Sequence, residues 1–456
     1  MTSLTPARPN HVWLAAVVPE NARSFRVQDP LLATTLVEAG AVLVDEAPDV
    51  EIADAHALRG DADHALVPLA RMPADDVSYP GLVVARLAGP LALRRDIRSA
   101  RAALQRHGYT RIDTATFDYG HALRRNDAGP RATLRERLPR NAVVVGAGAG
   151  ARASSTLLDA VTARAGESLG THIQQPRTGA RAGILVTFAS DAVLRVAVGP
   201  ARTQIISQAK ALETLREACG DALDKSLIPW TIDQGRLGLA DWSLEPRLHG
   251  NAPGWELDAR VVGSVLDFLA GLHSCRNSSA PRRTPADEAE DAASFLDESY
   301  STALRKLGRE VSGVIAELPH GFAHGDFFTG NILIEGRKIV GVVDWDAAGP
   351  NRPPLLDFLH LWHLGRRKIS DVDWGPSIVS DLLPWARAGG DDVLRSLARR
   401  IDVDVSPSKL EALVAAYWLA RLAAQLSRYA DRPDRPVWMR QNVDFVLHEL
   451  SATRWG

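Results

Sequence analysis

Residues 321–346 read GFAHGDFFTGNILIEGRKIVGVVDWD, and this segment carries the pattern that decides the fold. Asp326 and Asn331 share one loop, and Asp344 follows a pair of short apolar runs joined by a turn. Phosphoryl transfer to a hydroxyl needs a carboxylate that orients the hydroxyl, and hard oxygen ligands that hold Mg²⁺ against the phosphates. Asp326 fits the first requirement, and Asn331 with Asp344 fits the second.

The segment resembles the aminoglycoside phosphotransferase/choline kinase family, whose loop reads H-G-D-x-x-x-x-N and is followed by a D-W or D-F motif. The resemblance implies that Asp326 is the catalytic base and that His324 stabilises its loop. It also implies that Asn331 and Asp344 bind magnesium. Asp346 either assists metal binding or only orients the loop.

Two further residues bear on this resemblance. Protein kinases have Arg before the catalytic Asp, whereas this chain has Gly325, which favours the branch that acts on small molecules. Asp357, in PPLLDFLHL, resembles the downstream Asp that braces the catalytic loop. A chance loop with capping carboxylates is the alternative, because Asp and Asn are common in turns. The intervening strand pair and Asp357 argue against chance.

The chain upstream resembles the N-terminal lobe of the same family. Apolar runs at 183–190 and 192–198 predict a β-hairpin. The resemblance implies that the turn over 177–183, which contains Gly179 and Gly183, covers the nucleotide phosphates.

Arg195 stands where the family usually has a phosphate-binding Lys. Arg can hold phosphate through its fork, but it is not equivalent to Lys. The predicted helix 203–218 should offer a Glu partner, and it places Gln208 near that position, with Glu213 as an alternative. An exposed strand residue is the competing interpretation of Arg195.

The stretch at 241–250 resembles the hinge that receives adenine, with Ser243, Leu244 and Glu245 at its centre. The resemblance implies ATP and Mg²⁺ as cofactors and a small hydroxyl compound as acceptor: a sugar, an aminoglycoside, an amino alcohol or a glycolipid precursor. Two alternatives stay open. One is a kinase-fold protein that binds a nucleotide or a partner without transfer. The other is a bifunctional protein with a methyltransferase-like N-terminal domain.

The chain has 456 residues, too many for one compact core. We expect a layered, Rossmann-like α/β domain over 1–150 and a linker helix over 151–167, capped by a serine. An α+β, bilobal, protein-kinase-like domain follows, with its N-lobe at 168–250 and a mostly helical C-lobe at 251–456. A polar loop is expected from 274 to 290.

The N-terminal elements are predicted from short apolar runs and a capped helix: strands at 12–18, 64–70, 81–87 and 141–145, and a helix at 97–108. The glycines at 146–151 fit a nucleotide-binding pattern after a strand, but no acidic strand end follows them. We interpret them as a strand end and a linker. Residues 107–125 resemble the last helix and strand of class I methyltransferases, without an intact cofactor motif.

The formal net charge of −2 gives no field that would attract nucleic acid or an anionic membrane. Cys219 and Cys275 provide no zinc spacing and no disulfide framework, so we expect a reducing cytoplasm. The N-terminal apolar patch is too short for a signal peptide. The apolar run 410–426 contains Glu411 and Arg421, which favours a buried helix over a membrane span. An Ala- and Arg-rich, Lys-poor composition is typical of GC-rich bacterial genomes.

Overall fold

The computed structural model describes residues 13–453, apart from 54–56, 71–94, 119–121, 125–140, 150–154, 171–176, 182–183, 255–257, 277–278, 371 and 430–434. It divides into two compact units, which are described separately. The first unit comprises Met1–Ile206 and Thr231–Arg247, and the second comprises Ser207–Trp230 and Leu248–Gly456. None of the described helices combines the length and the hydropathy that a membrane crossing requires.

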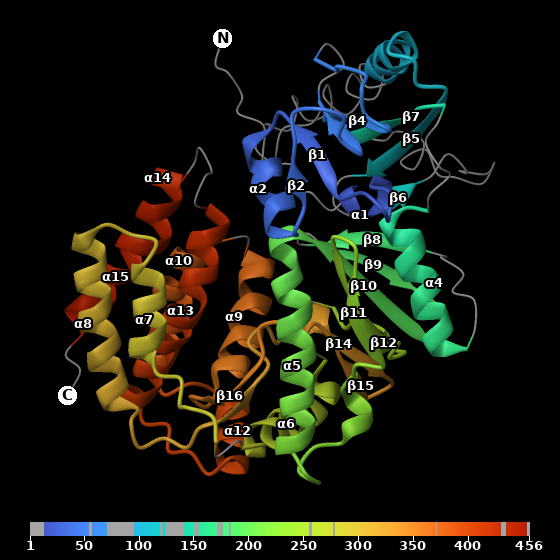
Figure 1. Cartoon of the computed structure of the whole chain (residues 1–456). Helices are drawn as coiled ribbons and strands as arrows, with labels where there is room; N and C mark the ends of the chain where they lie inside the picture. The colour runs from blue at the N-terminus through green and yellow to red at the C-terminus, as the bar shows by residue number, and fades with distance from the viewer. Residues whose placement is uncertain are drawn as a thin grey trace. The chain divides into compact units, whose positions relative to one another are not determined.

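The first unit contains a mixed, seven-stranded sheet of order β2-β1-β3-β4-β7-β5-β6 (Figure 1). Neighbouring strands among β1–β4 pair in parallel, whereas β7 is antiparallel to both β4 and β5. The predicted N-terminal α/β layer is therefore present. Its strands are β1 (Ser24–Val27), β2 (Val42–Leu43), β3 (Val50–Ile52), β4 (His64–Ala70), β5 (Arg111–Asp118), β6 (Ala122–Arg124) and β7 (Asn141–Ala147).

The direction of β7 bears on the glycine-rich stretch 146–151. A dinucleotide-binding glycine loop follows the carboxyl end of a parallel strand. Because β7 runs antiparallel to β4, its carboxyl end lies at the opposite edge of the sheet from the carboxyl ends of β1, β3 and β4. The topology thus favours a strand end over a nucleotide loop here.

Among the N-terminal predictions, β4, β7 and a helix at 95–106 are confirmed, and Gly108 follows that helix with a φ of 84°. The strand predicted at 12–18 is wrong, because Trp13–Val17 form helix α1. Leu14 and Val17 of this helix are buried, and a short apolar run that is buried all round has no periodicity to separate helix from strand. The strand predicted at 81–87 lies outside the described residues.

The first unit also contains an antiparallel, five-stranded sheet of order β11-β12-β10-β9-β8. The hairpin predicted at 183–198 is confirmed as its two central strands, β9 and β10. The strands are β8 (Arg177–Arg181), β9 (Ile184–Phe188), β10 (Ala192–Val198), β11 (Asp233–Leu237) and β12 (Ala240–Pro246).

The turn predicted over 177–183 is wrong over most of its length. Arg177–Arg181 form strand β8, in which Gly179 pairs with Val186 of β9. β8 supplies the ladder partner that the outer edge of β9 would otherwise lack. Residues 182 and 183, Gly183 among them, lie outside the described residues.

One hydrophobic core in this unit contains residues from both sheets and from the helices beside them. Phe25 of the first sheet and Leu194 and Trp242 of the second are among its buried members. Helix α4 (Leu157–Leu169) adds further buried side chains and begins at a capping box formed by Thr156 and Asp159, one or two residues after the serines expected to cap it. The limits of the predicted domains stay a prediction.

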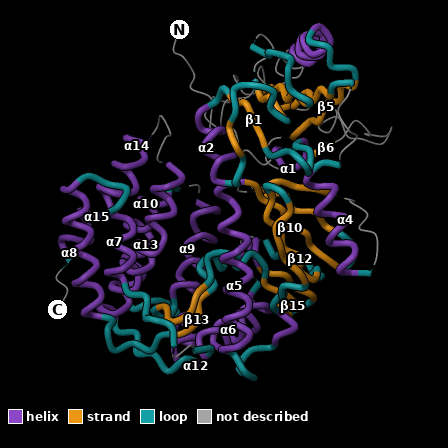
Figure 2. The backbone as a smooth tube through the Cα atoms, viewed as in Figure 1, coloured by secondary structure: helices purple, strands orange, loops and turns teal. Residues whose placement is uncertain are grey.

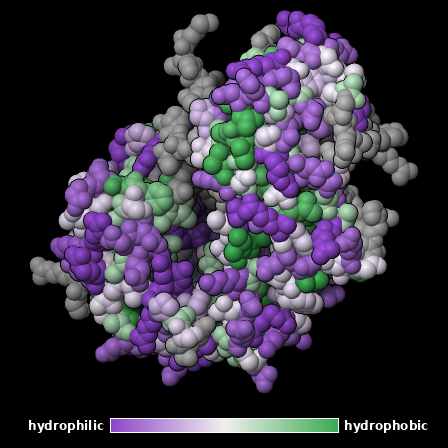
Figure 3. Space-filling model, in the orientation of Figure 1, coloured by the Kyte–Doolittle hydropathy of each residue, from purple (hydrophilic) through white to green (hydrophobic). Residues whose placement is uncertain are grey.

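The outer edge of the seven-stranded sheet is apolar. Val42 and Leu43 of β2 are exposed there, as is Val37 of the neighbouring helix α2 (Pro30–Glu38). Figure 3 shows apolar side chains gathered over these two elements.

The second unit is mostly helical, as predicted, with short strands among the helices (Figure 2). Its principal core includes the buried helix predicted at 410–426. Helix α5 (Arg202–Ala218) enters this unit from the first, after the 3₁₀ turn η1 (Gly199–Ala201). The other helical elements are η2 (Lys225–Leu227), α6 (Ala259–Ser274), α7 (Pro285–Ala293), α8 (Glu298–Val314), α9 (Leu356–Ser370), α10 (Trp374–Ser377), the π-helix η4 (Ile378–Leu382), α11 (Leu383–Arg387), α12 (Asp392–Arg400), α13 (Pro407–Tyr429), α14 (Arg435–Met439), the π-helix η5 (Arg440–Asp444) and α15 (Phe445–Ala452).

The loop predicted at 274–290 ends early, because α7 begins at Pro285. Thr284 caps α7 through a capping box with Asp287, and Pro285 occupies the first turn, where its missing N–H costs nothing. The acidic composition of the segment concealed these helix-start signals.

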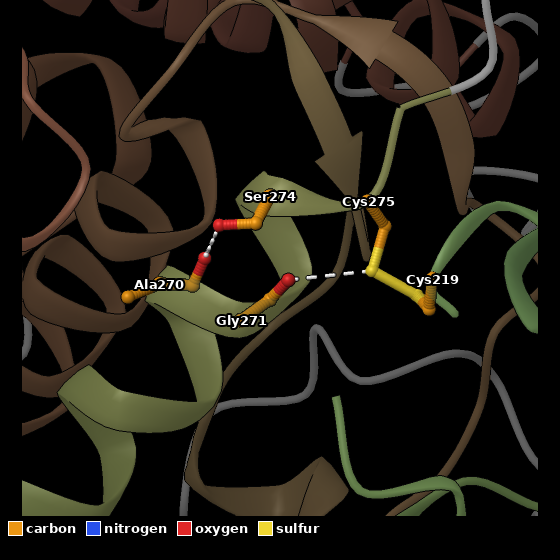
Figure 4. The surroundings of a disulfide bond; sticks show 5 residues. All are labelled: Cys219, Ala270, Gly271, Ser274 and Cys275. Carbon is orange, nitrogen blue, oxygen red and sulfur yellow. Dashed lines mark hydrogen bonds between the residues drawn. A yellow bond between two sulfur atoms is a disulfide. The ribbon is translucent and has the colours of Figure 1, made fainter. Parts of the chain in front are cut away.

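A disulfide joins Cys219, directly after α5, to Cys275, directly after α6 (Figure 4). Gly271 permits this approach, because a Cβ there would lie 2.7 Å from the carbonyl oxygen of Ala222. The expectation that the cysteines build no disulfide framework misses this bond, since 56 residues separate them and only the shared core brings them together. The cysteine count therefore gives no support for a reducing compartment.

His273, at the end of α6, makes the stability of this unit depend on pH. Burial, with smaller contributions from Arg276 and His320, lowers the pKa of its ring from 6.5 to about 4. The folded protein thus keeps the ring neutral, whereas the unfolded chain takes up a proton below pH 6.5. Acid therefore favours unfolding.

We expect the free energy of unfolding to fall as the pH decreases from about 6.5 to about 4, and His273→Leu to make this fall shallower. Urea unfolding at several pH values measures both slopes. Identical slopes in the variant and the natural protein would contradict the assignment to His273.

Candidate active site

The segment quoted at the start forms a strand, a loop and a hairpin within the second unit. β13 (Gly321–Ala323) leads into the loop, and η3 (Thr329–Asn331) leads out of it. The hairpin of β14 (Ile332–Glu335) and β15 (Lys338–Val342) follows as predicted. β13 pairs with β16 (Gly349–Arg352), a strand that begins three residues after the segment ends.

His324 ties the loop to the end of the hairpin. It is fully buried, and its Nε2 lies 3.0 Å from the carbonyl oxygen of Val343. The backbone N–H of Asp326 donates to its Nδ1 at 3.2 Å. Nδ1 must therefore be the acceptor and Nε2 the donor, which fixes a neutral tautomer. With both ring nitrogens engaged, His324 positions the loop and leaves no ring atom for a substrate.

Asp357, at the start of α9, braces the loop through two hydrogen bonds. Its carboxylate accepts the backbone N–H groups of His324 at 2.6 Å and of Gly325 at 2.8 Å. Burial raises the pKa of Asp357, while these two hydrogen bonds and His324 oppose that rise. This is the bracing position that the resemblance implied.

Gly325 occurs before Asp326 for a steric reason. Its φ is +79°, and a Cβ would lie 2.3 Å from the carbonyl oxygen of Ala347. A side chain at this position would therefore displace the loop from the segment after β15.

Asp326 is a carboxylate with one oxygen fully engaged. Its Oδ1 accepts from Nη2 of Arg421 at 2.8 Å and lies 3.2 Å from Nε2 of His360. Arg421 also donates to the carbonyl oxygen of Gly325 at 2.7 Å. Burial opposes ionisation, but the His360 contact and the Arg421 charge outweigh it and hold the pKa of Asp326 well below its usual range. The group is therefore ionised at any physiological pH.

Asn331 lies against Asp326 and has an oxygen to offer. Its Nδ2 donates to the carbonyl oxygen of Asp326 at 2.9 Å and to Oδ2 of Asp326 at 3.3 Å. Its Oδ1 is buried and has no hydrogen-bond partner among the described residues. A buried amide oxygen without a donor is costly unless something else, such as a cation, engages it.

Asp344 follows the hairpin in a strained conformation. The N–H of Val343 donates to the carbonyl oxygen of Asn331 at 3.0 Å, which places Asp344 next to the loop. The φ of Asp344 is +64°, and such left-handed non-glycine residues concentrate at functional sites. Trp345 beyond it is fully buried and donates to the carbonyl oxygen of Val342, which anchors this turn.

The donor set fits Mg²⁺. This ion commonly takes one or two carboxylates and completes its shell with phosphates and water. Oδ1 of Asn331 and the carboxylate of Asp344 are ligands of this kind, and Asp346 is exposed two residues further on. The described part of the chain contains no group of three or more His, Cys, Asp or Glu residues arranged so that they could hold a metal ion.

The first unit holds the residues expected to contact a nucleotide. Nε of Arg195 on β10 lies 3.6 Å from Oε1 of Glu245 on β12. This ion pair joins Arg195 to a neighbouring strand, a partner that was not expected from the sequence. Ser243 is the register partner of Arg195, and both Ser243 and Leu244 are buried.

Arg421 and His360 are the two contacts of Asp326 that were not singled out from the sequence. Arg421 left a signal, because a charge within the buried run 410–426 must have a specific partner. His360 also left a signal, because it follows Asp357 by three residues on α9 and so lies on the same face of that helix.

Together, the loop, the hairpin and the antiparallel sheet upstream define a kinase-like phosphotransferase fold. Residues 184–391 match the model described as the phosphotransferase enzyme family. Over these residues the chain is similar to that family.

A curated relative is homoserine kinase of Pseudomonas aeruginosa strain PAO1, which is 27% identical over 197 residues. The match covers 40% of this chain and spans 58% of the length of that relative.

Solved structures that resemble the chain include aminoglycoside phosphotransferases. One, from Streptomyces rimosus, shares 15% identity at a TM-score of 0.38, covering 52% of this chain and 89% of that one. Another, solved with streptomycin and ATP, shares 14% identity at a TM-score of 0.43, covering 65% of this chain and 96% of that one.

We expect Gly325→Ala to destabilise the second unit by about 2–3 kcal/mol, because it combines a left-handed residue with a backbone clash. Gly336→Ala is the matched control. Gly336 also has a positive φ, +59°, but nothing lies within 4 Å of its added Cβ. It should cost only about 1 kcal/mol. Urea unfolding gives both values, and equal losses would refute the steric argument.

Proposed function

We propose that this chain is an ATP- and Mg²⁺-dependent phosphotransferase that acts on a hydroxyl group of a small molecule. One observation supports this most directly. Asp326 is an ionised carboxylate whose Oδ1 is engaged by Arg421 and His360, and Asn331 beside it presents a buried Oδ1 without a partner among the described residues. This juxtaposition suits an acceptor hydroxyl on one side and a metal ion on the other.

Asp326 would orient the acceptor rather than deprotonate it early. A carboxylate whose pKa is held below its usual range is a weak base. Enzymatic phosphoryl transfer mostly proceeds through a loose transition state, in which positioning matters more than early proton removal. Oδ2 of Asp326 is the oxygen that would accept the hydrogen bond of the acceptor hydroxyl.

The metal would be held by Asn331 and Asp344, with Asp346 as an assisting or orienting residue. When bound, Mg²⁺ neutralises the charge of the phosphates. His324 and Asp357 fix the loop that carries Asp326, and so set where the hydroxyl can approach.

Arg195 would contact the phosphates of ATP from β10, held in place by Glu245. Ser243, Leu244 and Glu245, the centre of the proposed adenine hinge, lie on strand β12. In this arrangement Glu245 would affect phosphate binding by orienting Arg195.

The acceptor belongs to the class of small hydroxyl compounds: sugars, aminoglycosides, amino alcohols and glycolipid precursors. The names of the relatives add homoserine and streptomycin to the compounds worth testing. Turnover of ATP with a panel of such compounds is the experiment that tests the proposal.

Asp326→Asn should lower kcat by about 10²–10⁴-fold, because the amide no longer carries the charge that orients the hydroxyl. ATP affinity, measured by calorimetry, should change little. Asp267→Asn, at an exposed ion pair on α6, serves as the control and should keep its turnover. An Asp326→Asn enzyme with undiminished kcat would exclude this role.

Arg195→Met should raise the KM for ATP about tenfold and leave the KM for the acceptor unchanged, since a charge-assisted hydrogen bond contributes about 1.5–3 kcal/mol. Arg195→Lys should recover part of the loss, because it keeps the charge but not the fork. Steady-state kinetics with each substrate varied in turn separates these effects. An unchanged KM for ATP in Arg195→Met would place Arg195 outside the nucleotide site.

A further inference from the structure

Behind Asp326, a line of polar side chains runs through the core of the second unit. Nδ1 of His360 lies 3.0 Å from the hydroxyl of Tyr417, and that hydroxyl lies 3.1 Å from Nδ1 of His363. Nε2 of His363 lies 2.6 Å from the hydroxyl of Ser377. All four side chains are buried. Polar groups in such surroundings are stable only when each finds its partner.

Counting protons fixes the direction of these hydrogen bonds. The Tyr417 hydroxyl has one proton, so one of its two histidine neighbours must donate to it and the other must accept from it. Burial lowers the pKa of His360 to about 4 and of His363 to about 3, so each ring is neutral and carries a single N–H. All hydrogen bonds of the line therefore run in the same direction from donor to acceptor.

Asp326 decides which way. A carboxylate can only accept, and Nε2 of His360 lies 3.2 Å from Oδ1 of Asp326, so the single N–H of the ring is placed on Nε2, facing that oxygen. Nδ1 of His360 then accepts from Tyr417, and Tyr417 accepts from Nδ1–H of His363. The remaining atom, Nε2 of His363, needs a donor.

Ser377 is the group placed to be that donor. Its hydroxyl faces two acceptors, Nε2 of His363 at 2.6 Å and the carbonyl oxygen of Trp374 at 3.0 Å, and it has one proton. The shorter contact favours donation to His363, while the carbonyl oxygen of Trp374 also accepts the backbone N–H of Ile378.

We propose that His360 is a positioning residue for Asp326, held in its donor form by Tyr417, His363 and Ser377. His360 and Arg421 together fix Oδ1 of Asp326, so that Oδ2 is the oxygen presented to the acceptor hydroxyl. The inference rests on the proposed function and names residues of the same site that act through Asp326.

The direction of these hydrogen bonds excludes proton relay as a second role of His360. His360 already carries its proton on the side of Asp326, and its other nitrogen is occupied by the Tyr417 proton. A proton released by the acceptor at Oδ2 therefore cannot pass into the core. The line orients the carboxylate and does not relay protons.

The test compares two substitutions at His360. His360→Leu removes the donor and should lower kcat about 10²-fold, the cost typical of a misplaced catalytic group. The KM values for ATP and acceptor should stay within about twofold of those of the natural protein, because neither substrate touches His360. His360→Gln places an amide N–H near the position of Nε2 and should recover most of the lost turnover.

Two further variants separate positioning from folding. Tyr417→Phe removes only the hydroxyl and should lower kcat less than His360→Leu does, since Arg421 still holds Asp326. His320→Leu alters another buried histidine, which contacts the carbonyl oxygen of Leu318 and is not part of the line. It should change the melting temperature only, so a fall in its kcat equal to that of His360→Leu would indicate a general packing effect and overturn the proposal.

The pH dependence of kcat gives an independent readout. Positioning predicts profiles of the same shape for the natural protein and His360→Gln, because His360 does not titrate during turnover. Loss of an acidic limb in His360→Gln would show that His360 exchanges protons and would overturn the proposal. So would equal activity of His360→Leu and the natural protein. Absence of any turnover by the natural protein would instead contradict the proposed function.

Discussion

The buried carboxylate of Asp357 is the constraint on which the site depends. A loop between a strand and a hairpin has backbone N–H groups that no ladder satisfies, and Asp357 accepts two of them, from His324 and Gly325. Burying this group is costly, as the rise in its pKa shows. The two hydrogen bonds recover part of that cost only when the loop is in place, so the folding of α9 and the shape of the loop are coupled.

In the same loop, the contacts that orient the carboxylate of Asp326 also make it a weaker base. The contacts of Asp326 with Arg421 and His360 fix its direction, but they also stabilise its charge. A carboxylate held in this way is well placed and weakly basic. This combination suits phosphoryl transfer, in which the nucleophile needs alignment more than early deprotonation. It would suit proton abstraction from carbon poorly.

In the first unit, the five-stranded sheet shares its hydrophobic core with N-terminal residues. Leu185, Leu194 and Trp242 of the five-stranded sheet share a core with Leu14 and Phe25 from the N-terminal part. The N-terminal residues thus contribute apolar surface to the sheet that carries Arg195. This gives them a structural role in the protein, whatever further activity they have.

The sequence by itself determined those parts of the fold and site whose residues are neighbours along the chain. The loop of Asp326, its five-residue spacing to Asn331, the hairpin and Asp344 are neighbours along the chain, so their order already indicated their chemistry. Local signals failed where burial overrode them. The run at 12–18 contains helix α1, because so short an apolar run has no clear periodicity to separate helix from strand, and residues 177–181 form a strand because they pair with the edge of β9. Only the tertiary structure decided the partners that lie far away in sequence. Arg421, His360, the Arg195–Glu245 pair and the Cys219–Cys275 disulfide are each set by packing between distant elements, and the order of residues does not encode those contacts directly.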